Sequence, residues 1–192
     1  MTKIGYKQNK EFYKKVINKY GISPRGVHWN CEQSQYKRFE VLTNFIKNDI
    51  QNSCVIDAGC GFGEYYNYLY DTNLKPLSYL GIDCEEEMIK HASKRFINIE
   101  FQVCNILEDK LINVDYYICS GAMNILTQEE VFLFIQRCYE NSSKGFIFNF
   151  LKQDSFNKVP IKLVLSFCKT LCKKILIKDD YLENDISIFL KK

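Results

Sequence analysis

The part of the sequence that most constrains the fold is the stretch Ser53 to Tyr66, SCVIDAGCGFGEYY. It begins with the apolar run Cys54 to Ile56, which predicts a short buried strand. The run ends at Asp57, three glycines follow at alternate positions, and the residues after them can form a helix. Glycine lets a backbone turn tightly and approach a ligand where a Cβ atom would collide. A strand, a glycine-rich turn and a helix in this order predict a nucleotide-type binding site in an α/β fold.

The glycine spacing and the acid before the glycines distinguish two classes of ligand. Dinucleotide-binding loops have the pattern G-x-G-x-x-G and place a pyrophosphate at the start of the helix. Here Gly59, Gly61 and Gly63 form G-x-G-x-G, and Asp57 comes just before them. A carboxylate at this place repels a pyrophosphate but attracts an ammonium group, which S-adenosylmethionine (SAM) carries in its amino-acid tail. We therefore expect a SAM-type ligand rather than the cofactor of a dehydrogenase; a strand–helix turn without a ligand is the structural alternative.

Five stretches resemble motifs of the class I SAM-dependent methyltransferases. VIDAGCGFG (55–63) is similar to the first motif of that family, and LGID (80–83) to its ribose-binding acid motif. VCNI (103–106) occupies the place of a G-D-[AI] motif that meets adenine, with Asn where Asp is common. DYYICSGAMNIL (115–126) resembles the motif that flanks the transferred methyl group, and GFIFNFL (145–151) resembles the fifth-strand motif.

Strands and helices alternate along the chain, which predicts a parallel sheet with right-handed crossovers. Beyond the first strand, apolar patterns predict strands at 77–83, 98–104, 114–119, 145–151, 174–178 and 185–190, and helices at 9–20, 33–47, 85–96 and 160–171 and after the glycine loop. A capping box at Thr127 to Glu130 predicts a helix whose inward face is Val131, Phe132, Ile135, Cys138 and Tyr139. The expected fold class is α/β: a Rossmann-like, seven-stranded, mostly parallel sheet with helices on both faces, whose last two strands form an antiparallel hairpin. A single domain over 1–192 is expected, with an N-terminal helical lid at about 1–50.

The cofactor is expected beside the residues that follow the strands, because open parallel sheets bind ligands outside the carboxyl ends of their strands. The glycine loop with Asp57 would hold the methionine part of SAM. Asp83 lies 20 residues beyond the last loop glycine, where a carboxylate can accept hydrogen bonds from the ribose hydroxyls. By the resemblance, Asn105 and Ile106 would hold adenine, since an amide can still accept through its carbonyl oxygen. The residues expected at the cofactor are Trp29, Arg38, Asp57, Ala58, Gly59, Cys60, Gly61, Asp83, Cys84, Met88, Asn105, Ile106 and Ser120.

Two more stretches resemble a narrower group, small bacterial methyltransferases of unassigned substrate. HWNCEQSQYKRFEVL (28–42) is similar to their N-terminal pattern W-x(4)-S-Q-x-x-R-F-x-x-L, and DYLENDISIFLKK (180–192) to their C-terminal hairpin. This resemblance implies that Trp29, Gln35 and Arg38 lie by the SAM pocket. Arg38 would then bind the SAM carboxylate bidentately, and a pair on the helix surface is the alternative.

The chemistry of methyl transfer places few demands on catalytic residues. A sulfonium is an already activated electrophile, so the protein must mainly align the reactants and exclude water. If the nucleophile is an oxygen, His28 in the expected lid is the candidate base, because histidine titrates near neutral pH; a structural or surface role is the alternative. Tyr13, Asn124 and Asn149 are candidates for orienting a substrate, with packing as the alternative for each.

Charge, cysteine content and the apolar runs limit the partners, the metal or disulfide chemistry and the location that can be expected. The net charge of +3 identifies no partner, but residues 152–178 carry seven lysines against one aspartate, which could bind RNA, an anionic metabolite or an acidic membrane, or form a solvated helix face. Nine cysteines without a C-x-x-C pair, beside two histidines, predict neither a disulfide framework nor a metal site. No apolar run reaches the ~18 residues that span a bilayer, and the N-terminus lacks the apolar core of a signal peptide. The cytoplasm is therefore the expected location.

The sequence predicts a SAM-dependent methyltransferase that acts on a small cytoplasmic metabolite and releases S-adenosylhomocysteine (SAH). One alternative is a tRNA or RNA methyltransferase that uses the lysine-rich C-terminal third. Another is a non-catalytic SAM- or SAH-binding protein. The sequence predicts no membrane partner, and it identifies neither the methyl acceptor nor the oligomeric state.

Overall fold

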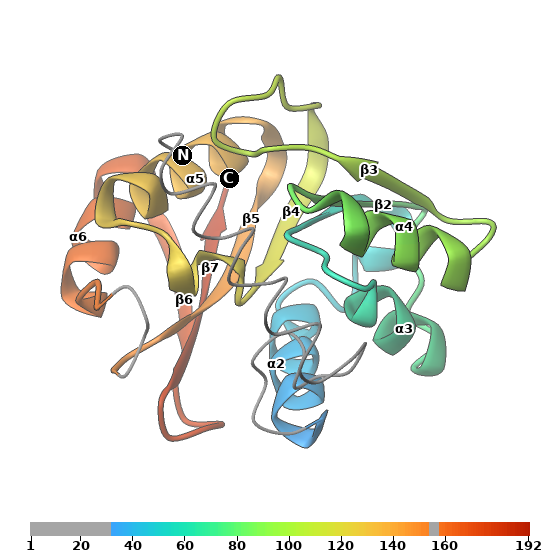
Figure 1. The fold of residues 1–192 in the computed structure, drawn as a ribbon. Helices are drawn as coiled ribbons and strands as arrows, with labels where there is room; N and C mark the ends of the chain where they lie inside the picture. The colour runs from blue at the N-terminus through green and yellow to red at the C-terminus, as the bar shows by residue number, and fades with distance from the viewer. Residues whose placement is uncertain (1–31, 154–157) are drawn as a thin grey trace.

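A seven-stranded sheet forms the centre of the molecule, in the order β3-β2-β1-β4-β5-β7-β6 (Figure 1). The computed structural model describes residues 32–153 and 158–192. The strands are β1 (Cys54–Ala58), β2 (Ser78–Asp83), β3 (Glu100–Val103), β4 (Val114–Ser120), β5 (Ser142–Leu151), β6 (Lys174–Lys178) and β7 (Asp185–Lys191), and the helices are α2 (Glu32–Asn44), α3 (Glu64–Asp71), α4 (Glu86–Arg95), α5 (Gln128–Glu140) and α6 (Ile161–Leu171), with short 3-10 helices η2 (Ile50–Asn52) and η3 (Ala122–Ile125). Strands β1 to β5 run parallel, and β7 pairs antiparallel with both β5 and β6. The predicted α/β fold and its C-terminal hairpin are confirmed.

The two faces of the sheet carry separate apolar cores. On one face, strand residues such as Tyr117 and Phe148 pack with the inner sides of α5 and α6. On the other face, Ile118 and Ile147 pack with α2 and α3. Helix α4 packs on β2 and β3 beside α3, so that helices cover both faces, as Figure 1 shows. Because neighbouring residues of a strand point to opposite faces, a strand that is apolar along most of its length contributes side chains to both cores.

Helix α5 begins where the sequence predicts it. Thr127 Oγ1 accepts the backbone N–H of Glu130 at 3.3 Å, and the Glu130 carboxylate accepts the N–H of Thr127 at 3.0 Å. The predicted inward residues lie in or against the core: Val131, Ile135 and Cys138 are buried, and Phe132 and Tyr139 are partly buried and pack against it. Phe134, which the sequence did not single out, is buried as well, and Phe132 stacks on Phe167 of α6 with ring centroids 4.4 Å apart. A second helix beside α5 therefore widens its apolar face beyond the stripe that meets the sheet.

The crossover from β3 to β4 (104–113) contains no helix, unlike the other parallel crossovers of the sheet. Its first residues turn sharply at the carboxyl end of β3: the N–H of Asn105 donates to Asp109 Oδ2 at 2.7 Å, and the N–H of Leu107 donates to Asn105 Oδ1 at 3.1 Å. This turn brings 105–107 alongside the ends of β2 and β1, where a ligand of the sheet would lie.

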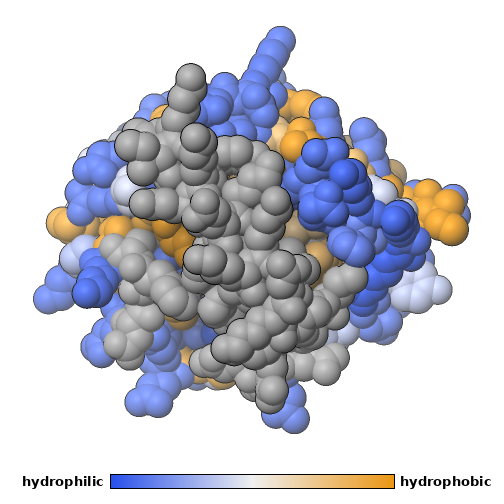
Figure 2. Space-filling model, viewed as in Figure 1, coloured by the Kyte–Doolittle hydropathy of each residue, from blue (hydrophilic) through white to orange (hydrophobic). Residues whose placement is uncertain are grey.

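The face of the molecule in Figure 2 is largely hydrophilic, with apolar side chains visible in separate areas. Ile97, after α4, and Leu163, on α6, are among the large apolar side chains exposed to solvent. None of the helices in residues 32–153 and 158–192 combines the length and apolar character needed to cross a membrane.

Candidate functional site

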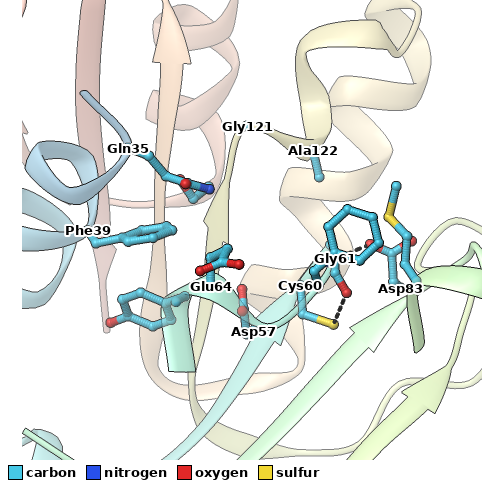
Figure 3. A pocket seen from close by; sticks show the side chains of 14 residues that line it. Gln35, Phe39, Asp57, Cys60, Gly61, Glu64, Asp83, Gly121 and Ala122 are labelled. Atoms are coloured by element: carbon cyan, nitrogen blue, oxygen red, sulfur yellow. Dashed lines mark hydrogen bonds between the residues drawn. The ribbon is translucent and has the colours of Figure 1, made fainter. Parts of the chain in front are cut away.

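A cavity opens at the carboxyl ends of β1, β2 and β4, where the sequence places its glycine loop. Asp57 is the penultimate residue of β1, Asp83 ends β2, and Ser120 ends β4; all three line this cavity, together with the loop between β1 and α3. Helix α2 closes the cavity from the side with Gln35 and Phe39, which face the carboxylates in Figure 3. Parallel strands bring residues far apart in sequence to one edge of the sheet.

The first loop glycine sets the shape of the loop. Gly59 has φ +81°, a left-handed conformation, and a Cβ atom there would lie 2.3 Å from the Cβ of Ala122. The N–H groups of Gly59 and Cys60 both donate to the carbonyl of Ile82, at 2.8 and 3.0 Å. These bonds draw the loop over the end of β2, and the missing Cβ lets it touch η3, which follows β4. The loop therefore spans the three strand ends that form the site.

Asp83 is held in place by backbone donors. Its Oδ2 accepts the N–H of Gly61 at 2.9 Å, and its Oδ1 accepts the N–H of Glu85 at 2.9 Å. Burial raises the pKa of Asp83, while the N–H groups of Glu85, Gly61 and Cys84 act to lower it. Each carboxylate oxygen has a second lone pair, so the fixed carboxylate can accept further hydrogen bonds from a pair of hydroxyls.

Asp57 lies deeper and has a different environment. It is only 2% exposed, and the hydroxyl of Tyr79 donates to its Oδ2 at 2.7 Å. Burial raises the pKa of Asp57 to about 7, with a further increase from the charge of Asp83 and a decrease from the Tyr79 hydrogen bond. A cation placed against this carboxylate favours its ionised form, so the site gains charge when a positive group binds.

The charges around the cavity have one sign. Glu64, the first residue of α3, is the third carboxylate that lines it, and Arg95 of α4 holds this carboxylate from the outer side. Among the described residues that line the cavity there is no lysine, arginine or histidine. The cavity therefore favours a ligand with positive charge and disfavours a phosphate.

A second cavity continues from the first along the ends of β2 and β3. The two share Gly59, Asp83 and Ala122, and the second is walled by apolar residues that include Ile106 and Phe134. Cys84, Cys104 and Asn105 also line it. An apolar cavity with a few polar groups at its edge suits a flat aromatic base. Of the two lone pairs on Asn105 Oδ1, one accepts the N–H of Leu107, and the other can accept from a ligand.

The cavities contain most, but not all, of the predicted cofactor residues. Asp57, Cys60, Gly61, Met88 and Ser120 line the first cavity, Cys84, Asn105 and Ile106 line the second, and Gly59 and Asp83 line both. The side chain of Ala58 is different, because it is buried in the core on the α5 face and lines neither cavity. Tyr13, His28 and Trp29 lie outside the described residues. Their predicted roles stay predictions.

Arg38 differs most from its prediction. Its Nε donates to Asp185 Oδ1 at 2.5 Å and its Nη2 to Asp185 Oδ2 at 2.9 Å, and it lines neither cavity. The buried carboxylate of Asp185 on β7 supplies the bidentate partner that the resemblance assigned to a ligand. In this structure the guanidinium of Arg38 is therefore engaged by Asp185, and a role of Arg38 at a SAM carboxylate stays a prediction.

Several lining residues were missed at the level of the sequence. Phe39 was expected only as part of an apolar helix face, and Glu64 was not expected at the site, although it directly follows the glycine loop. Gly121 and Ala122 directly follow Ser120 at the end of the fourth strand, in the motif expected beside the transferred methyl group, but they were not among the expected cofactor residues.

Two of the three predicted substrate residues are described, and both carry buried polar atoms. Among the described residues, none forms a hydrogen bond with Asn124 Oδ1, Asn149 Oδ1 or the Ser120 hydroxyl. No group of three or more His, Cys, Asp or Glu side chains in residues 32–153 and 158–192 could hold a metal ion. These three atoms lie near the ends of β4 and β5, while Arg137 Nε on α5 is another buried atom without a hydrogen-bond partner among the described residues.

Comparison with known sequences matches part of the chain to a methyltransferase domain. Residues 55–145 match the sequence model of the methyltransferase domain family. The putative methyltransferase 235L of Invertebrate iridescent virus 6 is 38% identical over 89 residues, a match that covers 43% of this chain and 33% of the viral protein. The match thus spans about a third of the length of that curated relative.

Solved structures share the fold. Magnesium protoporphyrin IX methyltransferase from Synechocystis, solved with bound SAM, has a TM-score of 0.70 at 14% identity, covering 94% of this chain and 96% of that one. A TehB-like SAM-dependent methyltransferase from Corynebacterium glutamicum has a TM-score of 0.66 at 14% identity, covering 97% and 98%. At these identities the likeness shows the fold alone. Residues 55–145 thus match a methyltransferase domain over just under half of the chain, and the chain has the fold of SAM-dependent methyltransferases.

Proposed function

We propose that the chain binds SAM across the two adjoining cavities and transfers its methyl group to a small metabolite. The observation that carries the proposal is the pair of carboxylates on either side of the glycine loop, the buried Asp57 and the half-buried Asp83. They lie in a cavity whose described lining holds no cationic side chain. SAM presents a sulfonium and an ammonium group and no phosphate, which matches this charge pattern.

Each part of the cofactor has a matching set of residues. Asp57 and the glycine loop would hold the methionine part, and Asp83 would accept from the ribose hydroxyls. Asn105 would accept from the adenine amino group beside the apolar wall that includes Ile106. Phe39 on α2 lies over the first cavity, where an aromatic ring excludes water from the reacting atoms.

The reaction needs alignment more than acid–base chemistry. Bound SAM supplies a methyl carbon on a positively charged sulfur. A lone pair of the acceptor forms the new bond to that carbon, the electrons of the sulfur–carbon bond return to sulfur, and the acceptor loses its proton when it is an O–H or N–H group. The chain contributes a fixed cavity floor at β1 and β2 and an acceptor side at β4 and β5. His28 as a base, Tyr13 and Trp29 at the site, a lid over 1–50 and a cytoplasmic location remain parts of this proposal.

The acidic lining favours a small acceptor over RNA, because phosphates would be repelled from the cavity. A tRNA or RNA methyltransferase that docks through its lysine-rich C-terminal third is the second candidate, and a non-catalytic SAH-binding protein is the third. Turnover of radiolabelled SAM with extracted small metabolites supports the first. A salt-dependent gel shift with bulk tRNA supports the second, because phosphate contacts give steep salt dependence.

Calorimetry with SAH tests the cofactor site directly. Asp83→Ala should weaken SAH binding by about 2 kcal/mol, or about 30-fold, because hydrogen bonds to a charged group are lost. Glu86→Ala is the matched control, since Glu86 is an exposed acid on α4 that pairs with Lys90. Folded wild-type protein that ignores SAH at millimolar concentration would refute the proposal, as would equal affinities of the two variants.

A further inference from the structure

A row of polar side chains crosses the sheet on the face that α2 covers. Ser120 of β4 lies opposite Asn149 of β5, and Asn149 lies opposite Ser187 of β7. Residues opposite each other on paired strands point to the same face. The next residues on this face, such as Ile147 and Phe189, belong to the apolar core. The row is therefore polar although its neighbours on the same face are apolar. Burying polar groups costs free energy unless each has a hydrogen-bond partner.

Asn149 is fully buried and is held from one side only. Its Nδ2 donates to Asp185 Oδ1 at 3.2 Å, and Asp185 in turn accepts two hydrogen bonds from Arg38. A carboxylate engaged by a guanidinium accepts only, so the amide nitrogen must face Asp185 and the amide oxygen must point away from it. The ion pair between α2 and β7 thereby sets the orientation of Asn149 Oδ1.

This oriented oxygen has no hydrogen-bond donor among the described residues. The hydroxyl of Ser187, its neighbour on β7, is engaged with the hydroxyl of Tyr181 at 2.8 Å. The hydroxyl of Ser120, its neighbour on β4, also has no partner in the described part of the chain, and Ser120 lines the first cavity. An unpaired buried acceptor costs roughly 1–3 kcal/mol, which a donor group of a ligand would recover.

We propose that Asn149 Oδ1 and the Ser120 hydroxyl bind the polar end of the methyl acceptor, and that the acceptor is a neutral or cationic molecule that donates an N–H or O–H group to Asn149. The proposal rests on the proposed function and names its substrate class. Asp185 is the positioning residue, because it acts on the acceptor only through the Asn149 amide.

The charges around the site disfavour anionic acceptors. The adjoining cavity is lined by the carboxylates of Asp57 and Asp83 and by Glu64, whose charge is balanced by Arg95. The charge of Arg38, the cationic side chain that approaches the row from α2, is balanced by Asp185. A carboxylate or phosphate on the acceptor would meet negative charge and acceptor atoms, whereas an amine, amidine, imidazole, phenol or alcohol finds hydrogen-bond acceptors.

Small probes added to the SAH complex test the proposal. Phenol, imidazole and benzamidine represent neutral and cationic donors, and benzoate and phenyl phosphate represent anions. Binding is followed in ¹⁵N-labelled protein through the side-chain amide signal of Asn149, which is assigned by its absence from Asn149→Leu. We expect at least one of the three donor probes to bind and shift that signal, and both anions to bind at least tenfold more weakly.

Variants separate the acceptor site from the cofactor site. Asn149→Leu should weaken binding of the donor probes at least tenfold and leave the SAH affinity within about twofold of wild type. Asn149→Ser removes the amide oxygen without added bulk and serves the same purpose if the leucine variant does not fold. Ser187→Ala is the matched control, because it removes a hydroxyl from the same row that is already paired, and it should leave probe binding unchanged.

The outcomes distinguish this proposal from the one on which it rests. Tight binding of the anions, binding of none of the donor probes, or unchanged probe affinity in both Asn149 variants would overturn the acceptor site while SAH binding stands. If the folded wild-type protein does not bind SAH, the proposed function is overturned, and the acceptor site with it.

Discussion

Replacing Gly59 by alanine tests how the glycine loop is built. Gly59 has φ +81°, and a Cβ atom would lie 2.3 Å from the Cβ of Ala122, well inside van der Waals contact. A non-glycine residue in the left-handed region costs about 1–2 kcal/mol. Forcing the extra methyl group into a packed contact costs about 1–3 kcal/mol more. Gly59→Ala should therefore lower the free energy of unfolding by about 2–5 kcal/mol.

Gly61 provides a matched control two residues away. It also has a left-handed backbone, with φ +54°, but the nearest atom to an added Cβ is Met88 Sδ at 3.8 Å, an ordinary contact. Gly61→Ala should carry only the conformational cost of about 1–2 kcal/mol. Effects on the unfolded chain are the same for both variants and cancel in the comparison. The difference of about 1–3 kcal/mol then measures the contact with η3 alone.

Urea unfolding of four proteins provides the measurement: Gly59→Ala, Gly61→Ala, Ala122→Gly and the double variant Gly59→Ala with Ala122→Gly. With a slope of about 2 kcal/mol per molar, the two single glycine variants should differ in midpoint by about 0.5–1.5 M. Removing the Ala122 methyl group should restore about 1–3 kcal/mol to Gly59→Ala, which appears as a favourable coupling in the double-mutant cycle. Equal midpoints for the two glycine variants, or no rescue in the double variant, would refute the reasoning.

Three further predictions concern buried and capping groups. The pKa of Asp57 is raised from 3.8 to about 7, so the folded protein holds a proton that the unfolded chain releases. The protonated Asp57 therefore contributes fully to stability below pH ~4, and this contribution is lost as the pH rises through 7. Asp57→Asn should flatten the resulting fall in the free energy of unfolding, measured with urea between pH 5 and 8. Asp185→Ala or Arg38→Met should lower the free energy of unfolding by about 3–5 kcal/mol in the same assay, because each leaves a buried charge without its partner. The double variant Asp185→Leu with Arg38→Met should recover most of this stability, and additive losses would contradict a paired charge. Thr127→Ala should cost about 1 kcal/mol, and an unchanged thermal midpoint would show that the cap adds nothing.

The elements of this protein could be predicted wherever the decisive pattern is local. The strand Cys54–Ala58, its glycine loop and the acid at 83 are recognisable because each depends on a few adjacent residues. The same holds for the capping box of α5, whose two hydrogen bonds join residues three apart. The pattern did not single out Phe134, which is buried, because a helical pattern cannot tell which apolar residues face the sheet and which, like Phe132, face another helix.

The sequence alone determined the order of strands and helices, the fold class and the two acids that flank the cofactor loop. These features depend on the periodicity of apolar residues and on glycines that are close together in the sequence. Only the tertiary structure decided the partners of Arg38 and Asn149. Arg38 meets Asp185 across 147 positions of the chain, and Asn149 meets the same carboxylate across 36. Such pairings depend on which strands become neighbours in the sheet, and the resulting orphaned oxygen at Asn149 exists only once β5, β7 and α2 have packed together.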